Sequence, residues 1–343
     1  MKNDLINIAI VGAGQTGRGF LARLFYKNAN IVFIDSNRDL VNNLRHSKGY
    51  TVRYFNSGEP EFITGYEIYH IEDDIPMLQF CDVVFVSVLA ENTAAAGLWL
   101  EDKINSDAIV IACENAACPA ELFTGPIKEV AGSGAVFCTA INDGPTDILS
   151  EEYPFLHVGG YHGDVIKLPG IQHETDFDIL MQRKIYTYNA ASAVIAYLGA
   201  AKGYESFSDA ANDPQINDKL DEFYDEINKA ICTEYKIDFE EQRLFALQSK
   251  HKFQNKHISD SIARNAASPE RKLGPTERII KPANLIISRN GNPAISAEVA
   301  AAALHYMGVN SLTQAEEILQ NTCELSGNDL FYTMILKCLN YFA

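Results

Sequence analysis

Residues 8–20 read Ile8-Ala9-Ile10-Val11-Gly12-Ala13-Gly14-Gln15-Thr16-Gly17-Arg18-Gly19-Phe20, an apolar run that leads into closely spaced glycines and a helical pattern. This order predicts a strand, a tight turn and a helix N-terminus. In the dinucleotide-binding form of the turn, the first glycine allows the bend, the second lets a pyrophosphate approach, and the third allows close helix packing. The helix N-terminus adds free N–H groups and partial positive charge. We therefore expect the turn to bind a dinucleotide through Gly12, Gly14, Gln15, Thr16 and Gly17.

A second apolar run, residues 31–34, ends in Asp35, about 20 residues after the glycines, where the ribose-binding acid of such folds lies. A carboxylate at this place accepts hydrogen bonds from the ribose hydroxyls and repels a 2′-phosphate. The sequence therefore favours NAD over NADP. Arg38 is the opposing signal, because a nearby arginine accommodates that phosphate.

Size and composition narrow the class of protein. The 343 residues, 47% hydrophobic and 21% charged, give room for two domains and are typical of a soluble globular protein. The net charge of −17 argues against binding to nucleic acid or to an anionic membrane. The seven cysteines form no C-x-x-C pair, which fits a reducing compartment. With no signal-peptide pattern and no membrane-spanning run, we expect a cytoplasmic protein.

The first half alternates strands with helices, which predicts a Rossmann-type, doubly wound parallel sheet. Further strands are expected at residues 50–55, 67–71, 81–88, 107–113 and 135–140, and helices at 38–44, 92–104 and 119–131. Residues 50–55 and 67–71 are predicted to pair as an inserted ribbon, with Asn56-Ser57-Gly58 as turn chemistry between them.

The second half is predicted to be mainly α-helical, with helices at residues 185–201, 216–235, 239–251, 258–267, 297–306 and 330–341. We expect a dinucleotide-binding domain over residues 1–175 and a helical substrate domain over 176–343. The substrate site is expected between them, outside the carboxyl ends of the strands.

Hydride transfer from an alcohol needs a base for the hydroxyl proton and donors for the developing oxyanion. Lys184, Asn189 and Ser192 offer both. In a regular helix of about 100° per residue, Asn189 lies about 140° from Lys184, with Ser192 between them, so all three can face one cleft. A half-buried lysine beside a positive nicotinamide has its neutral form favoured. The alternative is a solvated lysine at a helix start and an asparagine in a cap or turn.

Four stretches resemble the polyol-specific long-chain dehydrogenase family, most closely its mannitol-1-phosphate dehydrogenase branch. Residues 12–20 are similar to G-A-G-x-x-G-R-G-F, and residues 112–115 to A-C-E-N. Residues 184–199 are similar to K-x-x-x-x-N-x-x-H followed by A-Y-L-G, and residues 271–279 to R-K-L-x-x-x-D-R-L. The likeness runs from the first glycines to about residue 285.

The resemblance implies Lys184 as the general base and Asn115 and Asn189 as donors to the alkoxide, with Asn115 also beside the cofactor. It implies catalysis without a metal, and no metal-ligand spacing contradicts this. His157 and His162, five residues apart, are interpreted as ordinary loop histidines.

Two departures fall where substrate contacts are expected. Ser192 stands where the motif has histidine, and a serine is shorter and does not titrate near pH 7. Asn142 and Asp143 stand where the branch usually has Asp-Arg. Asn142 is still expected to contact the substrate.

A basic cluster, Arg271, Lys272 and Arg278 with Lys281, is the candidate site for a substrate phosphate or carboxylate, which arginines bind in bidentate fashion. A salt-bridged surface is the equally weighted alternative.

The leading hypothesis is therefore an NAD-dependent dehydrogenase acting on a hexitol phosphate and a ketose phosphate. A second hypothesis keeps the chemistry on a free polyol or a hexonate or uronate. A third is a decayed NAD-binding sensor or scaffold.

Overall fold

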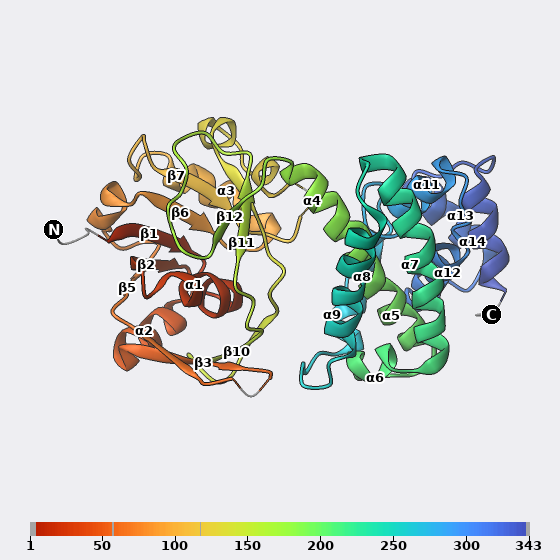
Figure 1. Ribbon diagram of the computed structural model, residues 1–343, viewed down its shortest axis with the longest axis horizontal. Coiled ribbons are helices and arrows are strands. Elements are labelled where there is room, and N and C mark those ends of the chain that lie inside the picture. The colour runs from red at the N-terminus through yellow and green to blue at the C-terminus, as the bar shows by residue number, and fades with distance from the viewer. Residues whose placement is uncertain (1–4, 57, 117, 341–343) are drawn as a thin grey trace. The chain divides into compact units, whose positions relative to one another are not determined.

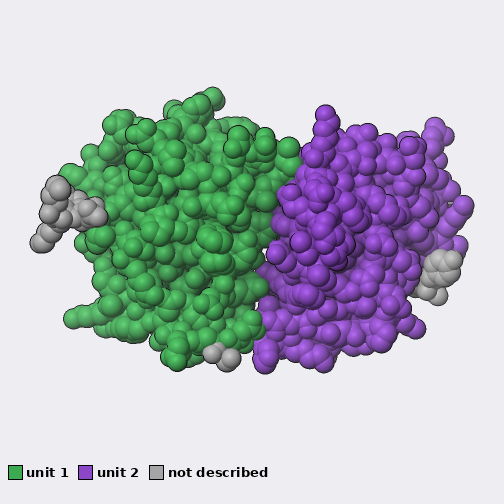
Figure 2. All heavy atoms as spheres, in the orientation of Figure 1, with its two compact units in different colours: residues 1–181 green, residues 182–343 purple. Residues whose placement is uncertain are grey.

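The computed structural model describes residues 5–56, 58–116 and 118–340. An α/β part (red to yellow-green) is followed along the chain by a helical part (green to blue), as Figure 1 shows. The chain divides into two compact units, residues 1–181 and residues 182–343, which have separate colours in Figure 2. The predicted fold class, a Rossmann-type sheet followed by a mainly helical part, is confirmed.

The main sheet of unit 1 has, within the described residues, eight strands in the order β12-β11-β8-β7-β6-β1-β2-β5. The six neighbouring strands β8, β7, β6, β1, β2 and β5 run parallel to one another. Their order is the 3-2-1-4-5-6 order of dinucleotide-binding folds. At the β8 edge, β11 (Leu156–Gly159) runs antiparallel and β12 (Ile171–His173) pairs with it. The parallel strands are β1 (Ile6–Val11), β2 (Ala29–Asp35), β5 (Glu67–His70), β6 (Val83–Val86), β7 (Ile109–Ala112) and β8 (Gly132–Ala135).

Helices cover both faces of this sheet. Successive side chains of a strand point to opposite faces, so Ile8 and Ile10 belong to one core cluster and Ala9 and Val11 to the other. The central strands are therefore apolar over most of their length. One face packs on η1 (Gly17–Ala22), α1 (Arg23–Phe25) and α2 (Arg38–Ser47), and the other on η2 (Pro76–Phe80), α3 (Ala90–Leu100), η3 (Pro119–Leu122) and η4 (Pro126–Glu129).

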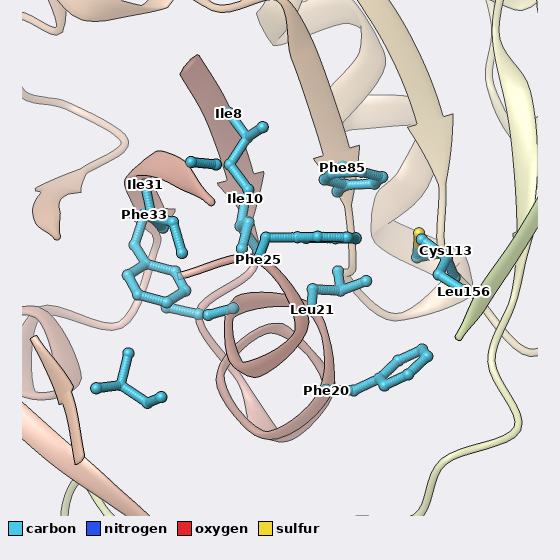
Figure 3. Packing of buried hydrophobic residues seen from close by; sticks show 14 of the residues in the cluster. Ile8, Ile10, Phe20, Leu21, Phe25, Ile31, Phe33, Phe85, Cys113 and Leu156 are labelled. Carbon is cyan, nitrogen blue, oxygen red and sulfur yellow. The ribbon is translucent and has the colours of Figure 1, made fainter. Parts of the chain in front are cut away.

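The first of these two cores is filled by aromatic rings from the helix and the sheet. Phe25 of α1 stacks on Phe85 of β6 with ring centroids 5.2 Å apart, and Figure 3 shows this pair beside Leu21 and Ile10. The stack fixes the helix that follows the glycine turn against the centre of the sheet.

A second sheet, in the order β4-β3-β10-β9, covers part of the same face. Here β3 (Gly49–Tyr54) pairs antiparallel with β4 (Glu61–Thr64), whereas β5 joins β2 in the main sheet. The predicted ribbon between residues 50–55 and 67–71 is therefore wrong. Gly65, at φ +77°, makes a second turn that separates β4 from β5. Ser57 of the expected turn lies outside the described residues. β10 (Ile148–Ser150) and β9 (Ala140–Asn142) complete this sheet.

Two further predictions in unit 1 are corrected. The helix expected at 119–131 is the pair of short 3₁₀ turns η3 and η4, because prolines begin both turns and Gly125 between them has φ +71°. The strand expected at 135–140 is β8 at Gly132–Ala135. Its glycines carry no apolar signal; a Cβ on Gly132 would lie 2.5 Å from the Tyr161 Cβ atom.

Unit 2 is built around two helices that are buried on nearly all sides, α5 and α12, which pack on each other. Their alanine-rich sequences suit a core position, because a helix that is apolar all round must be buried. Asp213 and Asp238 cap the N-termini of α7 and α8 through their side chains. The helices are α4 (Phe177–Lys184), η5 (Ile185–Asn189), α5 (Ala190–Ala201), α6 (Phe207–Ala211), α7 (Pro214–Tyr235), α8 (Phe239–Gln254), α9 (Ile262–Ala266), α10 (Pro269–Lys272), α11 (Ile280–Ser288), α12 (Ala294–Tyr306), α13 (Leu312–Asn321) and α14 (Leu330–Leu339).

The sequence prediction missed α4, α6, α10, α11 and α13, and it overextended α9. Ser261 caps α9 through its side chain, so the helix starts only after that residue. Tyr341, the predicted end of the last helix, lies outside the described residues. Over residues 5–56, 58–116 and 118–340, no helix combines the length and apolar character that crossing a bilayer requires.

Candidate functional site

In unit 1, neighbouring strands bring the candidate nucleotide residues to one edge of the sheet. Val11 at the end of β1 lies opposite Ile34 of β2 and Val86 of β6, and Val86 lies opposite Ala112 of β7. Since β2 and β6 flank β1 and are reached in opposite directions along the sheet, the strand order reverses here. Ligands of open α/β sheets bind at this switch point, outside the carboxyl ends of the strands.

The glycines of the turn have different structural roles. Gly12 has φ +99°, and a Cβ on it would lie 2.4 Å from the Ser87 backbone oxygen. A Cβ on Gly17 would lie 2.0 Å from the Gly12 backbone oxygen. At Gly14, a Cβ would meet no atom within 4 Å. The fold itself therefore requires Gly12 and Gly17, whereas the space beside Gly14 is open to a ligand.

Asp35 lies at the end of β2 and contacts the glycine turn directly. One carboxylate oxygen accepts a hydrogen bond from the Ala13 N–H at 2.8 Å, and the other accepts one from the Asn37 N–H at 2.8 Å. A carboxylate has about four acceptor positions, so these two bonds leave capacity for hydroxyl donors. Arg38 pairs with Glu72, which places a second carboxylate near the position where an arginine would meet a 2′-phosphate.

Next to Gly17, the buried side chain of Arg18 joins the turn to Asn142. The guanidinium donates to the Ala13 backbone oxygen at 2.7 Å, to the Asn142 side-chain oxygen at 2.9 Å, and to the Thr146 backbone oxygen. Asn142 at the end of β9 is thus held beside the nucleotide edge. No sequence pattern indicates this contact, because the two residues are 124 positions apart.

Asp143, the second departure from the branch pattern, has a partner on β3. Its carboxylate pairs with Arg53, which also lies 3.3 Å from the Asp147 carboxylate. The arginine missing at position 143 is therefore accompanied by an arginine on a neighbouring strand, held between two acids. Asn115 belongs to the same unit, exposed in the loop after β7.

In unit 2, Lys184, Asn189 and Ser192 lie on one continuous helical segment formed by α4, η5 and α5. Lys184 and Asn189 are buried, with 3% and 9% of their surface exposed, and Ser192 is half-buried. Between the first two lies a π-turn, in which the Ala190 N–H donates to the Ile185 carbonyl five residues back.

The angle of about 140° expected from a regular helix is therefore wrong. A π-turn takes more residues per turn than the 3.6 of an α-helix, so it brings residues 184 and 189 closer to one side. The sequence contains no signal for this turn beyond the lysine and asparagine spacing.

Ser192 is linked to the basic cluster through Asn265, a residue that the sequence analysis did not identify. The serine hydroxyl donates to the Asn265 side-chain oxygen at 3.3 Å, and the Lys272 ammonium donates to the Asn265 backbone oxygen. Asn265 lies on α9, which packs against α5. One residue thus connects the position of the missing histidine to the R-K-L stretch.

The residues of the basic cluster lie close together, and an acidic residue neutralises part of their charge. Arg271 and Arg278 pair with Glu277 at 3.0 Å and 3.4 Å. Burial, followed by the charges of Arg278 and Arg271, lowers the pKa of Lys272 to about 8. Desolvation also lowers the pKa of Arg278. Cations held in a buried place at this electrostatic cost suit an anionic ligand, whereas the pairs with Glu277 agree with the salt-bridge alternative. Lys281 lies on α11, one turn beyond Glu277.

His157 lies on β11 and is not the loop residue that was expected. Its ring nitrogens lie 2.7 Å from the Glu174 carboxylate and 3.2 Å from the Tyr153 hydroxyl. His162 is exposed. Across the part of the chain that is described, no three His, Cys, Asp or Glu side chains gather as a possible metal site.

Comparison with known proteins finds a matching family model for each half of the chain. The model of the mannitol dehydrogenase C-terminal domain matches residues 176–330, and that of ketopantoate reductase PanE/ApbA matches residues 8–163. The mannitol-1-phosphate 5-dehydrogenase of Bacillus subtilis is 26% identical over 96% of this chain and 98% of its own length. That of Enterococcus faecalis is also 26% identical, over 83% of this chain and 82% of its own.

Among solved structures, the mannitol 2-dehydrogenase of Pseudomonas fluorescens, in a ternary complex with NAD and D-mannitol, gives a TM-score of 0.76. It is 14% identical and covers 98% of this chain and 92% of that one. At this identity the likeness shows the fold alone.

The glycine geometry predicts that two alanine substitutions in the same turn have different effects. Gly17→Ala forces a clash with the Gly12 backbone and is expected to lower the thermal unfolding midpoint by several degrees, as losses of about 1–3 kcal/mol do. Gly14→Ala meets open space, so it should leave the midpoint within about a degree and weaken NADH binding measured by fluorescence. Equal midpoints for the two variants would contradict the packing role of Gly17.

Proposed function

The chain belongs to the mannitol dehydrogenase family, and on this premise we propose that it is an NAD-dependent dehydrogenase that interconverts a hexitol phosphate and a ketose phosphate. Mannitol 1-phosphate and fructose 6-phosphate are the leading pair. The observation that carries the proposal is the burial of Lys184 and Asn189 on one helical segment, with a π-turn between them. Oxidoreductase chemistry on polyols agrees with the curated relatives over most of the chain.

NAD fits the residues at the carboxyl edge of the sheet. The open space at Gly14 suits a pyrophosphate, with Gly12, Gln15, Thr16 and Gly17 forming the rest of the turn. Asp35 would accept from the ribose hydroxyls. The Arg38–Glu72 pair supports NAD over NADP, because the arginine already has a carboxylate partner and a 2′-phosphate would meet two acids.

Oxidation of the alcohol divides between the proton and the hydride. Lys184 takes the hydroxyl proton on its Nζ atom, the C–H bond breaks, and the C–O bond becomes a carbonyl. Bound NAD⁺ supplies the acceptor for the hydride. Asn189 would donate a hydrogen bond to the oxygen while it carries negative charge, and Asn115 is the second proposed donor. The Ser192 hydroxyl donates to Asn265, and its oxygen would accept a hydrogen bond from a further substrate hydroxyl. Burial of Lys184 supports the role of base, because desolvation disfavours an ammonium ion.

The basic cluster gives the substrate phosphate its place in the proposal. Lys272 is buried and the Arg278 side chain is 10% exposed, whereas Arg271 is exposed, and phosphate oxygens would accept from all three. Asn142 would contact the polyol chain beside the nucleotide edge, where Arg18 holds it.

A second candidate is the same reaction on a free polyol or a hexonate. The pairs of Arg271 and Arg278 with Glu277 favour it, because they neutralise part of the cluster that would bind a phosphate. In either case, the seven cysteines without a C-x-x-C pair support a reducing, cytoplasmic location.

Lys184→Met removes the base while nearly preserving side-chain volume. We expect turnover of fructose 6-phosphate with NADH to fall by about 10²–10⁴-fold, the usual contribution of a general base, with NADH binding retained. Lys229→Met, an exposed lysine of α7, is the matched control and should keep full activity. Wild-type turnover of free ketoses or uronates alone would favour the second candidate, and full activity of Lys184→Met would refute the role of Lys184.

Arg278→Ala tests the phosphate site. Loss of a charge-assisted hydrogen bond costs about 1.5–3 kcal/mol, so KM for the sugar phosphate should rise by about tenfold to a hundredfold. KM for an unphosphorylated polyol should change little. Arg289→Ala, on the surface of the same unit beside Glu234, provides the control. Equal increases for both substrates would argue for the salt-bridge alternative.

Lys272 predicts a pH dependence of phosphate binding. Its pKa is lowered to about 8, so the ammonium is present below this pH and lost above it. KM for the sugar phosphate should therefore increase as pH rises through about 8. Lys272→Arg keeps the charge over this range and should flatten the profile between pH 7 and 9. An identical profile in the variant would show that another group controls the binding.

A further inference from the structure

The π-turn η5 needs an explanation, because π-turns are rare and occur mainly as single turns inside α-helices. A regular α-helix through the same residues would keep every i→i−4 hydrogen bond. Something outside the segment must therefore stabilise the extra residue. The neighbouring helix α8 packs directly on η5. Its side chains contact residues that precede and follow Lys184 in the sequence.

Gln242 of α8 makes the central contact. Its side chain is fully buried, and its amide oxygen accepts from the Arg183 Nε atom at 3.0 Å. The amide nitrogen donates to the Thr187 hydroxyl oxygen at 3.0 Å and to the Asn228 side-chain oxygen at 3.0 Å. One amide group thus holds the residue before Lys184 and a residue in the middle of η5.

The flanking residues of α8 strengthen the hold on Arg183. The Glu241 carboxylate lies 2.9 Å from the guanidinium, which stacks over the Phe245 ring at 4.8 Å from its centroid. Arg183 is mostly buried, at 13% side-chain exposure. The start of the segment is therefore fixed in position and in rotation about the helix axis.

Burial makes the contact between Gln242 and Thr187 demanding. Thr187 and Gln242 are both 0% exposed, so a helix that rotated Thr187 away would leave a buried amide donor without its acceptor. Such a loss is expensive in a low-dielectric core. The network therefore opposes conversion of η5 to a regular helix.

We propose that Gln242 is a positioning residue that holds the π-turn and thereby sets Lys184 and Asn189 on one side of the helical segment. The assignment of chemical roles to these two residues rests on the proposed function. The π-turn itself, and the dependence of its geometry on Gln242, do not.

The test compares two buried hydrogen-bond deletions on the same helix. Gln242→Leu removes the bridge to Arg183 and Thr187. Ser249→Ala, also on α8, removes a buried hydroxyl that hydrogen-bonds with the Tyr224 hydroxyl and the Ala246 carbonyl, and neither of these bonds involves a residue of η5. Both remove buried polar contacts, so a purely structural role predicts similar effects. Thr187→Val removes the acceptor in η5 from the other side and remains informative if Gln242→Leu does not fold.

Two readouts separate positioning from stability. Gln242→Leu and Thr187→Val should lower kcat by about tenfold or more while KM for NADH stays within twofold, because the turn that binds the dinucleotide is in the other unit. Amide hydrogen exchange over residues 184–190 should accelerate in both variants and not in Ser249→Ala. Because both variants break the bond between Gln242 and Thr187, the double variant should add little to the effect of Gln242→Leu.

The outcome that overturns the proposal is unchanged exchange over residues 184–190 and unchanged kcat in a folded Gln242→Leu or Thr187→Val protein. Accelerated exchange with active Lys184→Met would instead sustain the role of Gln242 in the turn and refute the proposed base. The two failures are thus distinguishable.

Discussion

The close approach of the Gly17 backbone to the Gly12 carbonyl is the constraint on which the packing of the α/β unit depends. A side chain on Gly17 would overlap the Gly12 carbonyl at 2.0 Å, so the first helix reaches the sheet only because this position lacks a Cβ atom. That approach brings Phe25 onto Phe85, closes one of the two cores, and leaves the N–H groups of the helix start at the switch point of the sheet. The close approach of the first helix to the glycine turn thus provides both the packing that stabilises the unit and the surface available to a dinucleotide.

The helical unit depends on a different constraint, a polar network inside an apolar core. The helix formed by η5 and α5 lies in the buried centre of this unit, yet it contains a turn that departs from regular geometry. Buried amides and hydroxyls are stabilising only when all of them have partners. The bonds of Gln242 to Arg183, Thr187 and Asn228 meet this condition. A core of alanines and leucines alone would favour a regular helix.

Sequence patterns with a local physical cause were predictable. The glycine turn, the buried strands and the long helices were found because their signals lie within a few residues of each other. The errors arose where a distant partner decides the structure. Residues 67–70 pair with β2 and not with β3. The strand β8 lacks an apolar sequence signal because its neighbours leave no room for side chains at Gly132 and Gly134. The π-turn follows from Gln242, more than fifty residues away, and Asn265 was missed for the same reason. Roles assigned to Lys184, Asn189 and Asn115 remain predictions.

The side chain of Arg18 links two segments of the α/β unit that lie far apart in the sequence. Its guanidinium bonds the glycine turn at Ala13 and the β9–β10 region at Asn142 and Thr146. A shift of either segment changes the free energy of the other through this shared cation, and such coupling is reciprocal. Whatever orders the turn also orders the segment around Asn142. We therefore expect a ligand that binds the glycine turn to change the affinity of the segment around Asn142, and a ligand at that segment to change the affinity of the turn by the same factor.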